Sequence, residues 1–118
     1  KLTTPARYAS MNKSEAILRK IKTLGKSILP KDSSLWLYGS RARGTAHAQS
    51  DWDLLILLNK DKTEFDDYGK YAFPIAMLGA TLDQEITPQI YTKKQWDAMS
   101  FTPFYKNVEQ DKKVILWD

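Results

Sequence analysis

Two apolar segments separated by a short polar stretch constrain the fold of this chain most strongly. Residues 34–38 (SLWLY) and 52–58 (WDLLILL) are rich in aromatic and aliphatic side chains, which predicts two β-strands. From Leu54 the second segment is apolar at every position, so we expect it inside a sheet with both faces buried. The connection is predicted to contain a turn at Gly39–Ser40, a short helix over 40–44 and a polar loop over 45–50.

The remaining segments alternate between helical and strand patterns. Asn12 followed by Glu15 is typical of a helix start, and apolar residues at helical spacing extend this helix to about residue 28. A helix is predicted over 62–71, and Pro74 either kinks it or opens a second segment that ends at Gly79. A strand over 84–91 contains Pro88, so it lies at an edge or is bulged there. Helices over 93–99 and 103–110 and a strand over 114–117 complete the prediction. This order predicts an α/β (α+β) protein with one small mixed sheet flanked by helices.

The composition limits the class of protein. A chain of 118 residues with 42% hydrophobic and 27% charged residues is enough for one domain, which we place at 11–118, after an N-terminal extension over 1–10. The absence of cysteine excludes disulfides, thiolate nucleophiles and zinc–thiolate sites. The longest aliphatic run, 54–58, is far too short to span a membrane, so we expect a cytoplasmic protein. The net charge of +4 comes from scattered lysines without a dense basic tract, so a nucleic-acid partner is possible but not indicated.

Two carboxylates open the second apolar segment. Asp51 and Asp53 are two residues apart, so on a strand both side chains point to one face. Carboxylates held this close repel each other unless a cation lies between them, and magnesium prefers carboxylate and phosphate oxygens. An isolated Asp-x-Asp is usually only a solvated strand start, but the preceding Gly-Ser turn and the flanking strands favour a magnesium site.

The Gly-Ser turn is a candidate phosphate site. Gly39 lets the backbone approach a ligand closely, Ser40 adds a hydroxyl, and the amides that follow lie at a helix start. Arg41 and Arg43 flank the turn with side chains that suit phosphate, although ordinary surface ion pairs explain them equally well. This is not a Walker loop, because no Gly-Lys-Ser/Thr follows.

Together these motifs resemble the signature of the nucleotidyltransferase superfamily related to DNA polymerase beta. The strings Tyr38–Gly44 (YGSRARG) and Ser50–Leu55 (SDWDLL) are most similar to its minimal nucleotidyltransferase branch, whose members are often antitoxins paired with HEPN-type toxins. The resemblance implies the nucleotidyltransferase fold and a third carboxylate on a later strand. Glu85 is the first choice and Asp83 the reserve, although the family usually has an aspartate within a smooth apolar strand.

The resemblance also implies the chemistry. A nucleoside monophosphate, AMP from ATP, would pass to a hydroxyl acceptor with release of pyrophosphate. Asp51, Asp53 and Glu85 would be the catalytic residues and hold two magnesium ions. The nucleotide would be bound by Gly39, Ser40, Arg41, Arg43 and Ser50. The alternative is an antitoxin that binds a HEPN-type partner with weak or no catalysis, and a third possibility is simple binding of nucleic acid through positive charge.

Other conspicuous residues have ordinary interpretations. His47, the only histidine, is interpreted as a loop residue. The four tryptophans are expected to be core or partly buried residues, not platforms on which a base stacks. Tyr91 and Phe104 could line a pocket for a base, although nothing in the sequence demands it.

Overall fold

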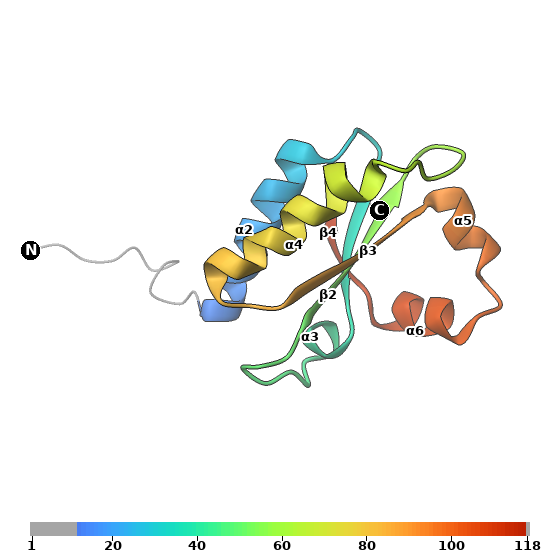
Figure 1. The fold of residues 1–118 in the computed structure, drawn as a ribbon. Coiled ribbons are helices and arrows are strands. Elements are labelled where there is room, and N and C mark those ends of the chain that lie inside the picture. Colours follow the sequence, from blue (N-terminus) through green and yellow to red (C-terminus); the bar gives the residue numbers. More distant parts are fainter. Residues whose placement is uncertain (1–11, 118) are drawn as a thin grey trace, which may run out of the picture.

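A four-stranded mixed sheet organises the molecule. The structure, a computed structural model, describes residues 12–117, so the extension predicted over 1–10 lies outside the described residues. The sheet has the order β3-β2-β1-β4, and Figure 1 shows helices on both of its faces. The strands are β1 (Ser34–Tyr38), β2 (Trp52–Leu58), β3 (Ile86–Thr92) and β4 (Lys113–Leu116).

The pairing of the strands confirms the predicted mixed α/β class. β1 runs antiparallel to β2 and β4, whereas β2 and β3 are parallel. As expected, β2 is an internal strand, and its residues from Leu54 to Leu58 are all buried. β3 lies at the edge, which is where Pro88 is tolerated, and its register with β2 continues through Pro88 without a bulge.

Helices α2 (Lys13–Ile28) and α4 (Phe73–Leu82) cover one face of the sheet. The start of α2 is the predicted capping box, in which the Glu15 amide donates to Asn12 Oδ1 at 2.8 Å and the Asn12 amide donates to Glu15 Oε1 at 3.0 Å. Ile17 and Ile21 bring the apolar side of α2 onto the sheet. This cluster is the larger part of the core.

Helices α5 (Lys93–Ala98) and α6 (Pro103–Asp111) pack against the opposite face. Trp96 is the centre of this second cluster, and its ring lies 4.8 Å from that of Tyr105, centroid to centroid. Trp36, Trp52 and Trp96 are buried, as predicted, whereas Trp117 is 44% exposed. A single cluster of aromatic side chains around Trp96 therefore fills the space between this face of the sheet and helices α5 and α6.

The predicted helix over 62–71 was wrong in its first half. The segment 62–66 is not helical, because the Asp67 carboxylate accepts from the Glu64 amide at 2.6 Å and from Lys60 Nζ at 2.9 Å, which closes a tight loop. A π-helix, η1 (Tyr68–Ala72), follows and continues into α4. Pro74 occupies the first turn of α4, so it opens a second segment.

The prediction that Gly79 ends the second segment was also wrong. α4 continues to Leu82, and Asp83 ends it in the left-handed conformation with φ 55°. A Cβ at Gly79 would lie 2.5 Å from the Gln84 carbonyl oxygen, so this glycine allows α4 to pack closely on the chain that leads into β3. Among the described residues, no helix is both long and apolar enough to cross a membrane.

Candidate active site

The Gly-Ser turn lies directly over the second aspartate. Gly39 follows β1 with φ 76°, and the short helix α3 (Ser40–Arg43) begins at once. A Cβ at Gly39 would collide with the carboxylate of Asp53, so only glycine allows the turn to sit this close. The first amides of such a helix have no carbonyl partner within it, which leaves donors beside the aspartate.

Asp53 is partly buried, on the face of the sheet against which α5 and α6 pack. It lies opposite Tyr38 in the β1–β2 register. Burial raises the pKa of Asp53, the nearby charge of Asp51 raises it further, and Arg43 opposes both effects. Burial raises the pKa of Tyr38 to about 12, with smaller contributions from Asp53 and Tyr91. Arg43 therefore offsets the effects of burial and Asp51 on Asp53 only in part.

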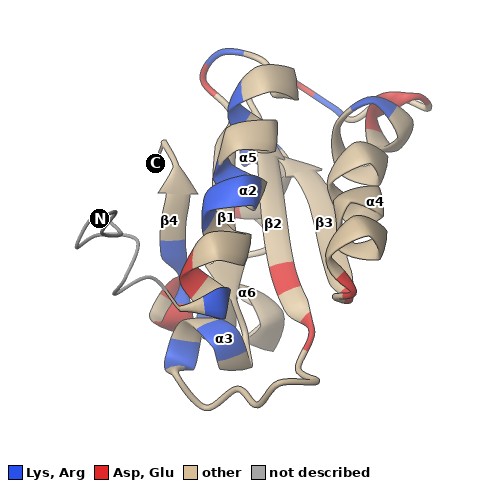
Figure 2. Ribbon diagram, turned by 90° about the vertical axis from the view of Figure 1, so that its left-hand side faces the viewer, with Lys and Arg blue, Asp and Glu red and all other residues tan. Residues whose placement is uncertain are grey.

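Asp51 lies just before β2, at the same end of the sheet as Asp53, but it borders a hollow that Asp53 does not line. It borders a hollow of about 750 Å³ together with Ser50, Glu85 and Asp83, the first choice and the reserve for a third carboxylate. Figure 2 shows the acidic starts of β2 and β3 at the same end of the molecule as the basic helix α3. This hollow contains three of the predicted acids, whereas Asp53 is not among its lining residues.

The three predicted metal ligands are not in mutual contact. In the part of the chain that the structure describes, the group of three acids with oxygens within 4.8 Å of one another is Glu64, Asp66 and Asp67. That group lies in the loop after β2, at the strand end remote from Asp53, and Lys60 neutralises Asp67 at 2.8 Å. This compact group of acids is therefore part of a loop that the Lys60–Asp67 ion pair closes, and it is distinct from the candidate site.

Glu85 lies immediately before β3, where its carbonyl oxygen accepts from the Trp52 amide at 2.8 Å. Its side chain is exposed. Thr87, two residues later, is the β3 residue in register with Asp53. The position beside Asp53 on the neighbouring strand thus carries a hydroxyl, and the nearest acid on this side, Glu85, lies two residues earlier, level with Asp51.

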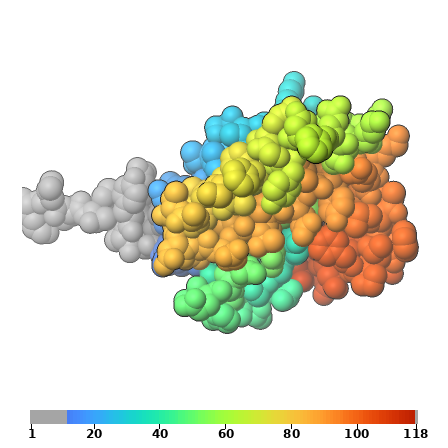
Figure 3. Space-filling model, in the orientation of Figure 1, coloured from blue at the N-terminus to red at the C-terminus, as the bar shows by residue number. Residues whose placement is uncertain are grey.

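Arg41 holds the loop that leads into the aspartates. Its guanidinium donates to the carbonyl oxygens of Ser50 at 3.0 Å and His47 at 3.2 Å, and it lies 4.3 Å from the centre of the Trp52 ring. The Ser50 hydroxyl accepts from the His47 amide at 2.9 Å, which closes the same loop. Figure 3 shows this segment, around residue 50, as a projection at the lower edge of the molecule. The loop is therefore held by internal hydrogen bonds of Arg41, Ser50 and His47.

Arg43 points instead toward the C-terminal part of the chain. Its Nη1 lies 3.0 Å from Asp111 Oδ2 at the end of α6, and its side chain is 48% exposed. Arg43 is also the cation that lowers the pKa of Asp53. Of the two arginines, Arg43 has the accessible side chain for phosphate.

Sequence reasoning missed two residues of this site. Tyr38 was recognised as the last residue of a strand and the first of the YGSRARG string, but not as a site residue, although antiparallel pairing across the Gly-Ser turn places it opposite Asp53. Asp111 is 68 residues from Arg43, and no local pattern indicates that they meet. Tyr91 and Phe104, which were considered for a base pocket, belong to the second core cluster, where Phe104 packs edge-on against Tyr38.

The family model of the nucleotidyltransferase domain matches residues 15–116, so the chain belongs to this family. No curated protein matches it significantly. The chain is similar to a solved toxin–antitoxin complex with AMP-PNP, with 24% identity, a TM-score of 0.61, and coverage of 86% of this chain and 73% of the other.

Two further solved structures are mutants of the toxin–antitoxin MntA-HpeT. The one with two Asp→Glu substitutions, two residues apart, has 20% identity, a TM-score of 0.59 and coverage of 86% of this chain and 73% of that one. The one with a Tyr→Ala substitution has 24% identity, a TM-score of 0.56 and coverage of 92% and 73%. These likenesses show that the fold is shared.

Proposed function

We propose that this nucleotidyltransferase moves AMP from ATP to a hydroxyl acceptor in a magnesium-dependent reaction that releases pyrophosphate. One observation carries the proposal: the Gly39–Ser40 turn lies directly on Asp53, with Asp51 two residues away. A turn with free amides next to paired carboxylates suits a triphosphate and its cation at once.

The residues fit magnesium. Asp51 and Asp53 supply the hard oxygen ligands that this ion prefers, and the pKa of Asp53 stays raised because Arg43 does not fully offset burial and the charge of Asp51. When bound, magnesium would neutralise phosphate charge and lower the pKa of the attacking hydroxyl. Glu85 would be a third ligand, and its place on the hollow beside Asp51 supports this role.

The remaining residues would bind and orient the nucleotide. Ser40 and the first amides of α3 would donate to the phosphates beyond the α-phosphate, and Arg43 would add a guanidinium. The acceptor oxygen would then form a bond to the α-phosphorus while the bond to pyrophosphate breaks, and the hydroxyl proton would leave to water. Such transfer needs mainly positioning and charge, which the residues at this end of the β1–β2 pair would provide.

The choice of ATP rests on the solved relative that carries AMP-PNP, an ATP analogue. The relative with two Asp→Glu substitutions has the same two-residue spacing as Asp51 and Asp53, which supports the proposed metal ligands. No described contact of this chain identifies adenine, so the choice of base needs a direct test.

The test is incubation with magnesium and each of four α-labelled nucleoside triphosphates, with host lysate as the source of acceptor. We expect label from ATP on a protein or RNA band with the wild type, and none with the Asp51→Asn/Asp53→Asn double variant. The Asp66→Asn variant is the matched control, because it removes an exposed acid outside the site. Label that persists in the double variant would contradict the proposed metal ligands.

A second function, that of an antitoxin, is favoured by the solved relatives, which are toxin–antitoxin complexes. In this alternative the chain would bind a HEPN-type toxin and neutralise it by contact. Co-expression with such a partner separates the two: neutralisation by Asp53→Asn as complete as that by the wild type would favour contact, whereas its loss together with transfer would favour catalysis.

A further inference from the structure

The outward face of α4 is apolar and carries no charge. Residues 71–82 contain no acidic or basic side chain, and Ile75 and Gly79, which face the sheet, are buried. Phe73 and Met77, on the opposite side of the helix, are 52% and 48% exposed. A helix that is apolar on both sides is typically covered on both sides. Figure 3 shows α4 as a band across the front of the molecule.

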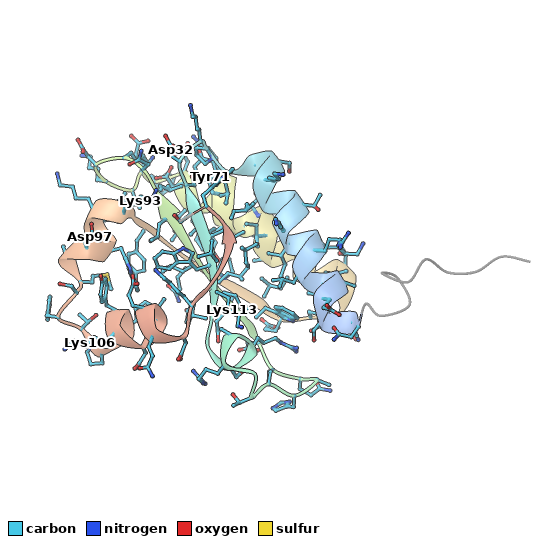
Figure 4. The ribbon with its side chains drawn as sticks, turned by 180° about the vertical axis from the view of Figure 1, so that it is seen from behind. Asp32, Tyr71, Lys93, Asp97, Lys106 and Lys113 are labelled. Carbon is cyan, nitrogen blue, oxygen red and sulfur yellow. The ribbon has the colours of Figure 1, made fainter. Side chains whose placement is uncertain are left out.

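A π-helical turn extends this apolar face toward the loop before it. The Phe73 amide donates to the carbonyl oxygen of Tyr68, five residues earlier, so Tyr68 lies about one turn before Phe73 on the same side. In a regular α-helix, a step of five residues would turn Tyr68 away by about 140°. Tyr71, labelled in Figure 4, packs instead against the larger core cluster. Tyr68, Phe73 and Met77 thus form one exposed row, which we call the α4 stripe.

The loop before η1 adds another exposed aromatic side chain. Phe65 is 104% exposed, although the loop around it is closed by Asp67, which pairs with Lys60 at 2.8 Å and accepts from the Glu64 amide at 2.6 Å. With about 200 Å² for a whole large side chain, Phe65 and the α4 stripe expose roughly 500 Å². This is more than half of the roughly 800 Å² that each partner buries in a stable complex.

Opposite charges lie at the two ends of the uncharged stretch. Lys70 precedes it and Asp83 follows it, and both are exposed. The midpoint of the stretch lies between Ala76 and Met77. If two copies pack antiparallel about a two-fold axis at this midpoint, Lys70 of each copy meets the partner's Asp83, whereas parallel packing would bring the two lysines together. The present ion pair of Lys70, with Asp66 at 3.5 Å, is exposed and easily exchanged.

We propose that the α4 stripe is the interface of a homodimer in which α4 packs antiparallel to α4 of a second copy. Phe73 of each copy would pack on the partner's Ala80, and Met77 would lie close to the two-fold axis. A symmetric interface of this kind must be complementary to itself, and an uncharged stripe between a lysine and an aspartate meets this requirement.

The same dimer would add a wall to the hollow beside the candidate site. Ala80 and Asp83 border this hollow, and its charged lining residues, Asp51, Asp83 and Glu85, are all acidic. The partner's Lys70 would bring a positive charge to this rim. The second copy would therefore contribute a residue next to Asp51.

Sedimentation equilibrium of the full chain tests the dimer. Between about 1 µM and about 1 mM, a range that includes weak interfaces, we expect the mass to rise from the 13.6 kDa of one chain to twice that value. Phe73→Lys should weaken dimerisation at least about tenfold, because it places two like charges in the apolar interface. Phe101→Lys is the matched control, because Phe101 is 78% exposed and lies between α5 and α6.

Urea unfolding of both variants shows whether they fold, and the control should dimerise like the wild type. A wild-type chain that keeps the mass of one copy throughout, or a dimer that a folded Phe73→Lys leaves intact, would overturn the proposal. A chain that is monomeric alone and uses the α4 stripe only to bind a HEPN-type toxin would overturn it as well, because a different protein would then cover the stripe.

Disulfide cross-linking tests the antiparallel packing, and the chain has no cysteine of its own to interfere. A mixture of Phe73→Cys and Ala80→Cys should form a mixed disulfide under mild oxidation. Phe73→Cys alone should not cross-link, because its two copies would lie about 10 Å apart along the helices, beyond the reach of a disulfide. Cross-linking of Phe73→Cys to itself, without the mixed product, would show parallel packing and contradict the proposed dimer.

Discussion

Asp53 shows how a single residue can cost stability in order to prepare a site. Its carboxylate is packed under Gly39, opposite Tyr38 and near a second acid, with only Arg43 as a compensating charge. Burial and Asp51 therefore raise its pKa, so the folded chain holds a proton on Asp53 more tightly than the unfolded chain does. Ionised Asp53 destabilises the fold until a cation binds.

We expect Asp53→Asn to be more stable than the wild type at neutral pH without magnesium, by under about 1 kcal/mol after screening by solvent. The penalty is complete above the raised pKa of folded Asp53 and disappears as the pH falls toward the ordinary value of 3.8. Urea unfolding at several pH values measures the difference between the two proteins, which should shrink toward acid.

Magnesium should have the opposite effect on stability in the same unfolding experiment. Adding it should raise the free energy of unfolding of the wild type, because only the folded state presents both aspartates, and should leave Asp53→Asn unchanged. Equal stabilisation of both proteins would show that the ion binds elsewhere, for example in the acidic loop at Glu64.

The two glycines that flank α3 allow the cost of backbone strain to be separated from the cost of a steric clash. Gly39 and Gly44 both have positive φ, 76° and 81°, but a Cβ at Gly44 would meet nothing within 4 Å whereas one at Gly39 would meet Asp53. We expect Gly44→Ala to cost about 1 kcal/mol from backbone strain alone. Gly39→Ala should cost about 1–3 kcal/mol more through overpacking, and should also abolish binding of AMP-PNP. Equal losses of stability in urea unfolding would contradict the close contact with Asp53.

At the scale of elements, the loop before β2 depends on one side chain from α3. The Arg41 guanidinium reaches three carbonyl oxygens of this loop and also Ser14 of α2 at 3.4 Å. A planar fork is needed to reach several acceptors at once, and a lysine cannot replace it. α3 therefore sets the position from which the chain enters Asp51 and β2.

We expect Arg41→Lys to destabilise the protein by about 1–2 kcal/mol, because several of these carbonyl oxygens lose their donor. Amide hydrogen exchange over residues 45–51 should accelerate more than elsewhere. Arg43→Lys is the matched control, since Arg43 is half-exposed and bonds only to Asp111 in the described structure, so it should cost at most about 1 kcal/mol. Similar exchange in both variants would assign the loop geometry to other contacts.

How far the sequence predicts these elements depends on the range of the interactions that decide them. The capping box at Asn12, the strands around Gly39 and the edge position of β3 were predictable because local patterns decide them. The loop at 62–66 was not predictable. Asp61 and Glu64 have the spacing of a helix start, but Asp67 closes a loop here through Lys60 and the Glu64 amide. Gly79 does not end the helix, because its role is to let the Gln84 carbonyl oxygen approach closely. Rules for helix ends do not predict such a tertiary contact.

The same distinction applies to the candidate site. The aspartate pair and the Gly-Ser turn were recognisable from spacing, and the structure places Gly39 against Asp53. The role of Arg41 was not recognisable, because a guanidinium beside a phosphate turn and one that holds a loop look alike in sequence. The neighbour of Asp53 on β3, Thr87, follows only from a parallel register that spans 34 residues.

At the scale of the whole molecule, the Arg43–Asp111 pair joins two segments that are far apart in the sequence. It links the start of the site on α3 to the last turn of α6, next to the edge strand β4. If Arg43 binds phosphate, as proposed above, then Asp111 competes with the nucleotide for the same guanidinium and adds a negative charge near it. The C-terminal helix would in this way reduce the positive field at the turn.

We therefore expect Asp111→Asn to bind AMP-PNP about two- to fivefold more tightly in the presence of magnesium, the gain expected from releasing one exposed ion pair. The freed Arg43 should also lower the pKa of Asp53, which carboxyl NMR can measure without nucleotide. Asp66→Asn, which breaks an exposed pair with Lys70 in the loop region, should change neither quantity. Weaker binding in Asp111→Asn would mean that the pair holds α3 in position, because the structural loss would then outweigh the release of charge.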